Sequence, residues 1–318
     1  MNIVEVEGLV KRYKELIAID NLDLTISQGE VFGLLGPNGS GKTTAINCML
    51  QLLTYDKGEI RLFGEDMKPT RYDLKRRIGI VPQNVAVFQQ LNVAENIDFF
   101  CSMYVKDRVR RKALVDEAIE FVGLQDYRRF RPRKLSGGLI RRLNIACGIA
   151  HQPELIFFDE PTVAVDPQSR NAILEGILRL NANGSTVIYT SHYMEEVEQI
   201  CSRIMIMDRG RALATGTNSE LKDMVGINER IEIELAGAVT SEDSRGQTAL
   251  ELVQGLAVVA SAKLEDGTLH ISCRRGSHNL SLILSTLQSA DIAYGRVYSE
   301  PPTLNDVFLE ITGKELRD

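Results

Sequence analysis

A glycine-rich segment near the N-terminus constrains the fold of this chain more than any other feature. An apolar run at residues 30–35 precedes it and predicts a buried strand, and the residues from Thr43 to about Leu53 have a helical pattern. The segment and the residue after it read Gly36, Pro37, Asn38, Gly39, Ser40, Gly41, Lys42, Thr43 and Thr44. A strand, a loop of this composition and a helix in this order form a phosphate-binding unit.

The residue types in this loop suit a nucleoside triphosphate. Its glycines let backbone N–H groups turn toward phosphate oxygens, and the N-terminus of the following helix favours negative charge. Lys42 is expected to reach the β- and γ-phosphates, and the Thr43 hydroxyl is expected to ligate Mg²⁺. A purely structural turn is the alternative, but it gives no reason for a lysine and a hydroxyl to stand together here.

A second site is predicted at the end of another apolar run. Residues 154–158 predict a central strand, and Asp159 and Glu160 follow it directly. Ligand sites in open α/β sheets lie at the carboxyl ends of the strands. Asp159 is therefore expected to hold Mg²⁺, and Glu160 to act as general base on an attacking water. A solvated pair of charges after a strand is the alternative.

Composition narrows the class of partner. The 318 residues are 44% hydrophobic, enough to bury a substantial core, and the formal net charge is -6. This balance provides no basic field for nucleic acid or an anionic membrane, so we expect no nucleic-acid partner. Basic residues do gather between Arg128 and Lys134, where a solvated surface and a partner-facing role both remain open.

The cysteines and the first residues indicate a cytosolic protein. The five cysteines lack CxxC or metal-site spacing, which favours reduced thiols packed as small apolar groups. The first residues lack the pattern of a secretory signal, and no apolar stretch approaches the ~20 residues of a membrane helix. We therefore expect that no part of this sequence crosses a bilayer by itself.

The last third of the sequence has a different pattern. From Arg230 it predicts a strand, a helix, two strands, a helix and a strand, with a final helix at about residues 303–310. This β-α-β-β-α-β order is that of the ferredoxin-like arrangement. We predict an α/β domain at residues 1–225, in which residues 84–150 form a helical subdomain, and a small α+β domain at residues 226–318.

One further motif separates this chain from other phosphate-binding folds. Leu135-Ser136-Gly137-Gly138 precedes a predicted helix at residues 139–150. With this motif in place, residues 1–225 resemble the ABC ATPase family, which implies a P-loop cassette that binds ATP and Mg²⁺ and hydrolyses ATP. Ser136, Gly137 and Gly138 at a helix N-terminus also suit a second anion site, although such a sequence by itself is more often a simple cap.

The resemblance assigns roles to four more residues. Gln83 is similar to the glutamine of the family's Q-loop, which implies contact with Mg²⁺ and the catalytic centre. His192 is similar to the switch histidine, Asp166 to the D-loop aspartate, and Tyr13 to the aromatic residue that stacks on adenine. Taken one at a time, Gln83 could be a surface residue, His192 a satisfied polar residue and Tyr13 a packing aromatic.

The resemblance also implies a second copy of the chain. One P-loop leaves a side of the triphosphate open, and the family covers it with a head-to-tail dimer. Each of two ATP molecules would then lie between Lys42 of one copy and Ser136 of the other.

Two residues depart from the common family pattern. Leu139 stands where glutamine is usual, and Val165 stands where leucine is usual. The Leu139 side chain cannot form a hydrogen bond, which removes any polar contact from that position. Neither change removes a phosphate-binding group, so we expect activity to survive.

The C-terminal end, residues 301–318, resembles the tail of prokaryotic ABC-2 type exporter ATPases. This implies export of an unidentified drug, antibiotic, peptide or lipid through a separate permease with several membrane helices. The chain would be a peripheral protein at the cytoplasmic side of the membrane. The permease would dock near residues 84–100, a segment that could also be ordinary subdomain surface.

A soluble ABC ATPase that acts on the ribosome or on DNA is the rival interpretation. Proteins of that kind carry two cassettes or a long coiled-coil insertion, whereas this chain has one P-loop and no heptad run. A regulatory module without hydrolysis would lack Glu160 or His192, and both are present. Export is therefore the favoured interpretation.

Overall fold

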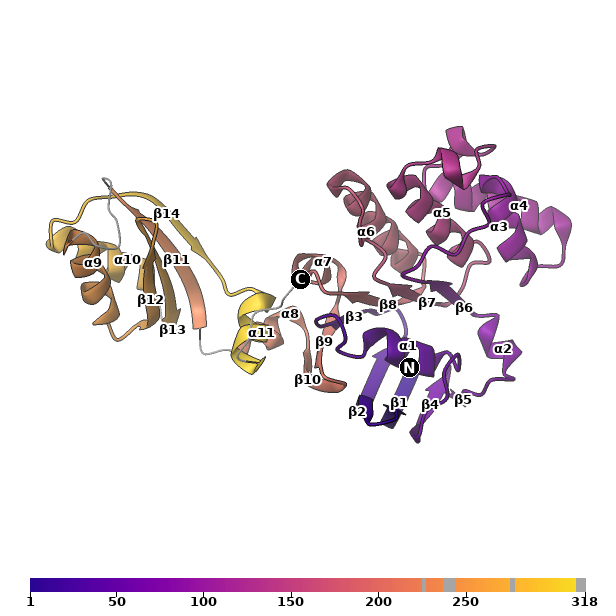
Figure 1. Cartoon of the computed structure of the whole chain (residues 1–318), viewed down its shortest axis with the longest axis horizontal. Coiled ribbons are helices and arrows are strands. Elements are labelled where there is room, and N and C mark those ends of the chain that lie inside the picture. Colours follow the sequence, from indigo (N-terminus) through magenta and orange to yellow (C-terminus); the bar gives the residue numbers. More distant parts are fainter. Residues whose placement is uncertain (225–226, 237–243, 275–277, 313–318) are drawn as a thin grey trace. The chain divides into compact units, whose positions relative to one another are not determined.

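The computed structural model describes residues 1–224, 227–236, 244–274 and 278–312 (Figure 1). They form two compact units that divide between Asn218 and Ser219. Each unit has a hydrophobic core of its own. Within the described residues, no helix has both the length and the apolar character needed to span a membrane.

A six-stranded sheet forms the centre of the first unit. Its strands lie in the order β10-β9-β3-β8-β7-β6, and all neighbours are parallel except β10 and β9. The strands are β3 (Val31–Leu35), β6 (Ile78–Val81), β7 (Leu155–Asp159), β8 (Thr186–Ser191), β9 (Arg203–Asp208) and β10 (Arg211–Gly216). Every residue of β3, β7 and β8 is buried. The strands predicted before the glycine-rich loop and before Glu160 are therefore confirmed.

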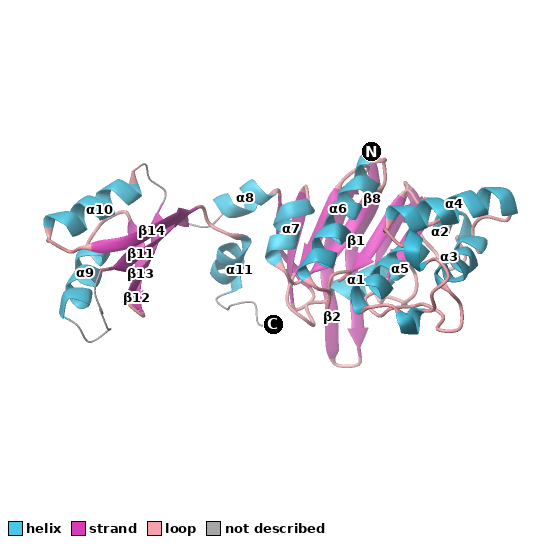
Figure 2. Ribbon diagram, turned by 90° about the horizontal axis from the view of Figure 1, so that it is seen from above, coloured by secondary structure: helices cyan, strands magenta, loops and turns pink. Residues whose placement is uncertain are grey.

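Helix α1 (Lys42–Met49) follows β3, helix α6 (Pro167–Ala182) joins β7 to β8, and helix α7 (Met194–Ile200) joins β8 to β9. Helices α6 and α7 pack against β8, as Figure 2 shows. Helix α1 ends earlier than the predicted Leu53 because Gln51 adopts a left-handed backbone conformation, with φ 56°. The amides of Leu52 and Leu53 then bond to the Asn47 carbonyl, which closes the helix.

A smaller antiparallel sheet shares the core of the first unit. Its order is β2-β1-β4-β5, with β1 (Asn2–Tyr13), β2 (Leu16–Ser27), β4 (Lys57–Leu62) and β5 (Glu65–Asp66), and the short helix α2 (Tyr72–Lys75) follows β5. Apolar residues of β1 and β2 pack in one cluster with those of α1 and β3. This packing holds the glycine-rich loop between the two sheets.

A helical subdomain occupies the middle of the first unit's sequence. It contains α3 (Val93–Ser102), α4 (Arg108–Phe121) and α5 (Gly137–Ile149), with 3₁₀ turns at Gln125–Tyr127 and Pro132–Lys134. Asn92 and Glu95 form a capping box at the start of α3, and the Asp107 carboxylate caps α4. The three helices bury an apolar cluster that is separate from the cluster under the sheets.

The second unit is built on four antiparallel strands in the order β12-β13-β11-β14. Its elements are α8 (Asn218–Asp223), β11 (Ile227–Leu235), α9 (Ser244–Gln254), β12 (Val259–Glu265), β13 (Thr268–Arg274), α10 (Asn279–Ser289), β14 (Tyr294–Glu300) and α11 (Leu304–Thr312). Ile231, Ile233 and Leu235 alternate along β11 and pack in one cluster with α9 and α10, so both helices lie on one face of the sheet. The predicted ferredoxin-like arrangement is confirmed.

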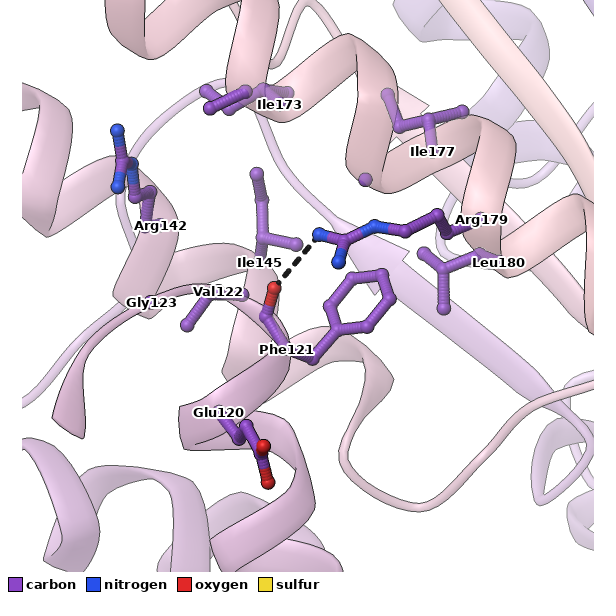
Figure 3. A pocket seen from close by; sticks show the side chains of 12 residues that line it. Glu120, Phe121, Val122, Gly123, Arg142, Ile145, Ile173, Ile177, Arg179 and Leu180 are labelled. Atoms are coloured by element: carbon purple, nitrogen blue, oxygen red, sulfur yellow. Dashed lines mark hydrogen bonds between the residues drawn. The ribbon is translucent and has the colours of Figure 1, made fainter.

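A cavity between α4, α5 and α6 permits a stabilising substitution (Figure 3). Gly176 lies inside α6, and a Cβ at this position would meet the Phe121 ring at 3.6 Å, an ordinary contact. Because alanine is the better helix former, Gly176→Ala should stabilise the unit by about 1 kcal/mol and raise its Tm by roughly 2–4 °C. Calorimetry can measure this against Glu175→Ala on the exposed face, where no shift is expected. A lower Tm for Gly176→Ala would contradict it.

Buried His151 should make stability depend on pH. Its Nε2 lies 3.0 Å from the Ile78 carbonyl oxygen, and its ring stacks on Tyr104 with centroids 3.8 Å apart. Burial lowers the pKa of His151, an effect that the Ile78 carbonyl only partly offsets. The unfolded chain therefore takes up this proton first, so stability is full above about pH 6.5 and falls as the pH drops.

The substitution His151→Phe keeps the ring stack and removes the titration. Its Tm should fall less than that of the unmodified protein when the pH is lowered from about 7.5 to about 5.5. Equal losses of Tm in the two proteins would show that His151 is not the group responsible.

Candidate active site

The glycine-rich loop joins β3 to α1 and leaves no room for side chains at two of its glycines. A Cβ at Gly36 would collide with the Met207 carbonyl oxygen, and a Cβ at Gly41 would lie 2.7 Å from the Ala18 carbonyl oxygen. Gly41 also has φ 107°, in the region that favours glycine. The loop is therefore held against β9 and β2, with the first free N–H groups of α1 facing outward from its end.

The polar groups of the loop suit phosphate oxygens. The Ser40 side chain is 1% exposed, and its hydroxyl has no hydrogen-bond partner within the described part of the chain. A buried hydroxyl without a partner is costly, so a ligand oxygen beside it would be stabilised. Asn38 and Gly39 are exposed at the tip of the loop, Pro37 and Thr44 are half-buried, and Thr44 lies on the first turn of α1.

Lys42 is a buried cation at the start of α1. It is 4% exposed, and its Nζ donates to the carbonyl oxygens of Gly36 at 2.7 Å and Pro37 at 3.2 Å. Its Nζ also lies 3.3 Å from Glu160 Oε1. Burial lowers the pKa of Lys42, whereas the Glu160 carboxylate acts to raise it. An anionic ligand at the loop would offer this ammonium a further partner.

Thr43 and Asp159 lie face to face. The Thr43 hydroxyl donates to Asp159 Oδ2 at 2.9 Å, and the Thr190 hydroxyl donates to Asp159 Oδ1 at 2.7 Å. Burial raises the pKa of Asp159, so this carboxylate carries its charge at a cost that a bound cation would relieve. A hydroxyl and a carboxylate oxygen are the hard oxygen ligands that Mg²⁺ prefers, so these two residues fit the predicted metal.

Three predicted residues converge on one carboxylate. Glu160 is 5% exposed, and its Oε2 accepts a 2.9 Å hydrogen bond from Gln83 Nε2. His192 Nδ1 lies 3.5 Å from Glu160 Oε1, the oxygen that also faces Lys42. Glu160 itself has φ 46°, a strained conformation for a residue with a side chain, which the sequence did not predict. Gln83 contacts Glu160 here rather than Thr43 or Asp159, the two residues that fit the metal.

The remaining predicted residues lie apart from this cluster. The Ser136 hydroxyl accepts from the Leu139 amide at 3.3 Å, so it caps its own helix, α5, while Ser136 and Gly137 are both exposed. A Cβ at Gly138 would lie 2.5 Å from Ser169 Oγ, which explains why only glycine fits between α5 and α6. Tyr13 ends β1 with 43% exposure, and the Lys11 ammonium lies 5.0 Å from its ring centre.

The two departures from the family pattern are both apolar contacts. Leu139 packs against the apolar cluster of the helical subdomain, and Val165 is buried next to Asp166, the residue predicted as the D-loop aspartate. Asp166 caps α6 by accepting from the Ser169 amide at 2.9 Å. Neither side chain lies among the groups that face the loop or Glu160.

Sequence reasoning missed a buried carboxylate beside His192. Glu196 is 2% exposed and accepts hydrogen bonds from the hydroxyls of Tyr189 at 2.6 Å, Thr162 at 2.8 Å and Ser191 at 3.0 Å. Burial and this carboxylate raise the pKa of Tyr189 well above its usual value. The available sequence signal was the adjacent pair Glu195 and Glu196 in a helical stretch after His192. Neighbouring side chains on a helix point in different directions, so Glu196 faces the interior while Glu195 faces solvent.

Comparisons with known proteins point to one family. The profile of the family described as ABC transporter matches residues 19–163. The linearmycin resistance ATP-binding protein of Bacillus subtilis is 36% identical and aligns over 99% of this chain and 100% of its own length. A daunorubicin resistance ATP-binding protein of Streptomyces coeruleorubidus is 35% identical over 99% and 97%, and the Nod factor export ATP-binding protein I of Ralstonia nicotianae is 33% identical over 99% and 95%.

Solved structures show the same fold. A dimeric ATP-binding cassette in a post-hydrolysis state with ADP and phosphate superposes with a TM-score of 0.63 at 26% identity, covering 67% of this chain and 98% of that one. An ATP-binding subunit of an ABC transporter gives a TM-score of 0.64 at 22% identity, over 70% and 92%. The full-length relatives and the shared fold place this chain in the family of ABC transporter ATP-binding proteins, and it is an ATPase.

Proposed function

We propose that this chain is the ATP-hydrolysing motor of an exporter, in which two copies close around two ATP molecules and act on a separate permease. The observation that carries the proposal is the convergence of Lys42, Gln83 and His192 on Glu160, next to the facing pair Thr43 and Asp159. A base, a cation and metal-ligand oxygens meet at the end of one strand and one helix, as phosphoryl transfer to water requires.

Each residue has a role in this proposal. Lys42 and the amides of the loop bind the phosphates, and the Tyr13 ring stacks on the base. Glu160 accepts the proton of the attacking water, while Gln83 and His192 hold its carboxylate in place. Thr43 and Asp159 would hold Mg²⁺, and the side-chain oxygen of Gln83, whose nitrogen donates to Glu160, is a further candidate ligand. The metal, when bound, offsets negative charge on the phosphates.

The second half of each site is assigned to a second copy. Ser136 and Gly137 are exposed at the N-terminus of α5, and a Cβ built on Gly137 meets nothing within 4 Å. The open space in front of this helix end suits the γ-phosphate held by another copy. The dimeric form of a solved cassette with the same fold supports this arrangement.

The permease is assigned to an aromatic cluster near the predicted docking segment. Phe88 and Phe99 are 43% and 39% exposed, and the ring of Phe99 meets those of Phe88 and Phe100 at centroid distances of 4.8 and 5.5 Å. Grouped exposed aromatic rings favour contact with an apolar partner. A cytosolic helix of a permease fits this surface, and such docking would hold the chain at the cytoplasmic side of the membrane.

The domain division and the cargo class complete the proposal. The domain predicted at residues 1–225 is assigned to the cassette and the one predicted at residues 226–318 to an accessory role, while the two compact units of the structure divide earlier, between Asn218 and Ser219. The names of the relatives, which concern linearmycin resistance, daunorubicin resistance and Nod factor export, support export of a drug or antibiotic among the predicted cargo classes. A soluble role on ribosomes or DNA has no comparable support.

Light scattering tests the ATP-driven dimer. Glu160→Gln protein should have the mass of one chain without nucleotide and of two chains with Mg-ATP. Adding Gly137→Val should abolish this ATP-dependent increase in mass, because the second copy would fill the space in front of Gly137. The Tm of the single chain should stay unchanged, because that space is open in one copy. A dimer without nucleotide would contradict ATP-driven closure, and a monomer in both conditions would contradict a dimer that forms without the permease.

A further inference from the structure

Helix α5 carries a buried cation that pairs with none of the carboxylates the structure describes. Arg141 is 8% exposed, and no carboxylate of the described part of the chain pairs with it. Its guanidinium instead donates to main-chain carbonyl oxygens: to Gln83 at 2.7 Å and, more weakly, to Pro82 and Val163 at 3.4 Å. Burial lowers the pKa of Arg141. A buried charge is costly unless its donors are satisfied, so these carbonyls hold it in one place.

A second buried side chain of α5, one turn after Arg141, forms hydrogen bonds with the same segment around Gln83. Asn144 is 2% exposed; its Nδ2 donates to the Pro82 carbonyl at 3.2 Å, and its Oδ1 accepts from the Ala86 amide at 3.0 Å. Residues three apart on a helix lie on the same face, so Arg141 and Asn144 form one contact surface. The chain from Pro82 to Ala86 is thus tied to α5 at both ends.

This contact links three parts of the site that are distant in sequence. Ser136 caps the N-terminus of α5, the Gln83 side chain donates to Glu160, and Val163 lies in the turn directly after Glu160. The tied segment also leads into the aromatic cluster of Phe88. The same contact thus joins the segment that carries Gln83, the turn after Glu160 and helix α5.

We propose that Arg141, with Asn144, is a positioning residue that sets the contact of Gln83 with Glu160 and couples it to the helix that Ser136 caps. The inference rests on the proposed role of Glu160 as the base. Arg141 touches no group assigned to ATP or metal; it acts through the main chain of Gln83 and Val163.

The kinetic test uses the purified full chain. Arg141→Met should lower kcat for ATP hydrolysis about 10- to 100-fold, because a small misplacement of a catalytic group has effects of this size. The KM for ATP should stay within about twofold, since Lys42, Thr43 and Asp159 keep their contacts. Arg141→Lys should recover part of kcat, because an ammonium can reach the Gln83 carbonyl but cannot span two acceptors as guanidinium does.

A double-mutant cycle separates positioning from general stability. If Arg141 acts through Gln83, Arg141→Met should add little to the loss already caused by Gln83→Ala. The matched control is Arg179→Met, which removes a guanidinium that donates to the Phe121 carbonyl at 3.1 Å in the cavity of Figure 3, with no expected change in kcat. If Arg141→Met does not fold, Asn144→Ala replaces it in the same cycle.

Additive losses, or a lower Tm with kcat unchanged, would overturn the inference and leave the proposed function intact. Turnover that persists in Glu160→Gln would instead remove the proposed role of Glu160, and the inference with it. Losses of kcat that are not additive between Arg141→Met and Gln83→Ala, with an unchanged KM for ATP, would support the inference.

Discussion

Replacing Glu160 with glutamine is expected to reduce ATP turnover by at least about 100-fold while ATP binding persists. Glutamine keeps the shape of the side chain but cannot accept a proton from water. Phosphate release measures the loss of turnover, and nucleotide binding measured on the same preparation shows whether ATP is still bound. Glu120→Gln, on the exposed side of α4, is the matched control and should turn over normally.

The same substitution should change the nucleotide-free protein. Glu160 lies 3.3 Å from Lys42, and both side chains are at least 95% buried, so glutamine leaves a buried ammonium without its carboxylate. The Tm without nucleotide should fall, and the rise on adding Mg-ATP should be larger than in the unmodified protein because phosphate then supplies the missing negative charge. Unchanged turnover in Glu160→Gln would remove Glu160 from the role of base.

Replacing Lys42 with alanine is expected to abolish measurable ATP hydrolysis and tight ATP binding. The ammonium is the only cation among the residues assigned to the phosphates, and charge-assisted bonds of this kind are the strong ones. The substitution also leaves Glu160 buried without Lys42, which should cost about 3 kcal/mol of folding stability. Isothermal titration with Mg-ATP measures the binding, and denaturant unfolding measures the stability.

Two variants sharpen this test. Lys57→Ala removes an exposed lysine from β4 and should leave binding, hydrolysis and Tm unchanged. Lys42→Arg keeps the charge, yet its planar guanidinium cannot reproduce the point contacts with the carbonyls of Gly36 and Pro37 and should remain inactive. Normal hydrolysis in Lys42→Ala would contradict the assignment of the glycine-rich loop as the phosphate site.

The sequence alone was enough for elements whose signals are local. The loop from Gly36 to Thr43, the apolar run that ends at Asp159 and the strand and helix order of the second unit all depend on neighbouring residues, so spacing and periodicity predict them. The end of α1 was predicted too late, because the left-handed turn at Gln51 leaves no pattern in the residue types around it. Local signals therefore predict which elements exist better than where they end.

Tertiary structure decided which side chains meet. Gln83 and Glu160 are 77 residues apart in sequence, and their contact depends on how β6, β7 and α5 pack. Tertiary packing also decided that Arg141, Asn144 and Glu196 are buried. From sequence alone, a charged or amide side chain is expected at the surface, because its buried partners are not known. The sequence by itself determined the phosphate-binding unit and the order of the elements, because these follow from short-range chemistry. Only the folded chain determined the carboxylate cluster and its supports, because burial and long-range contacts set the energy of a polar group.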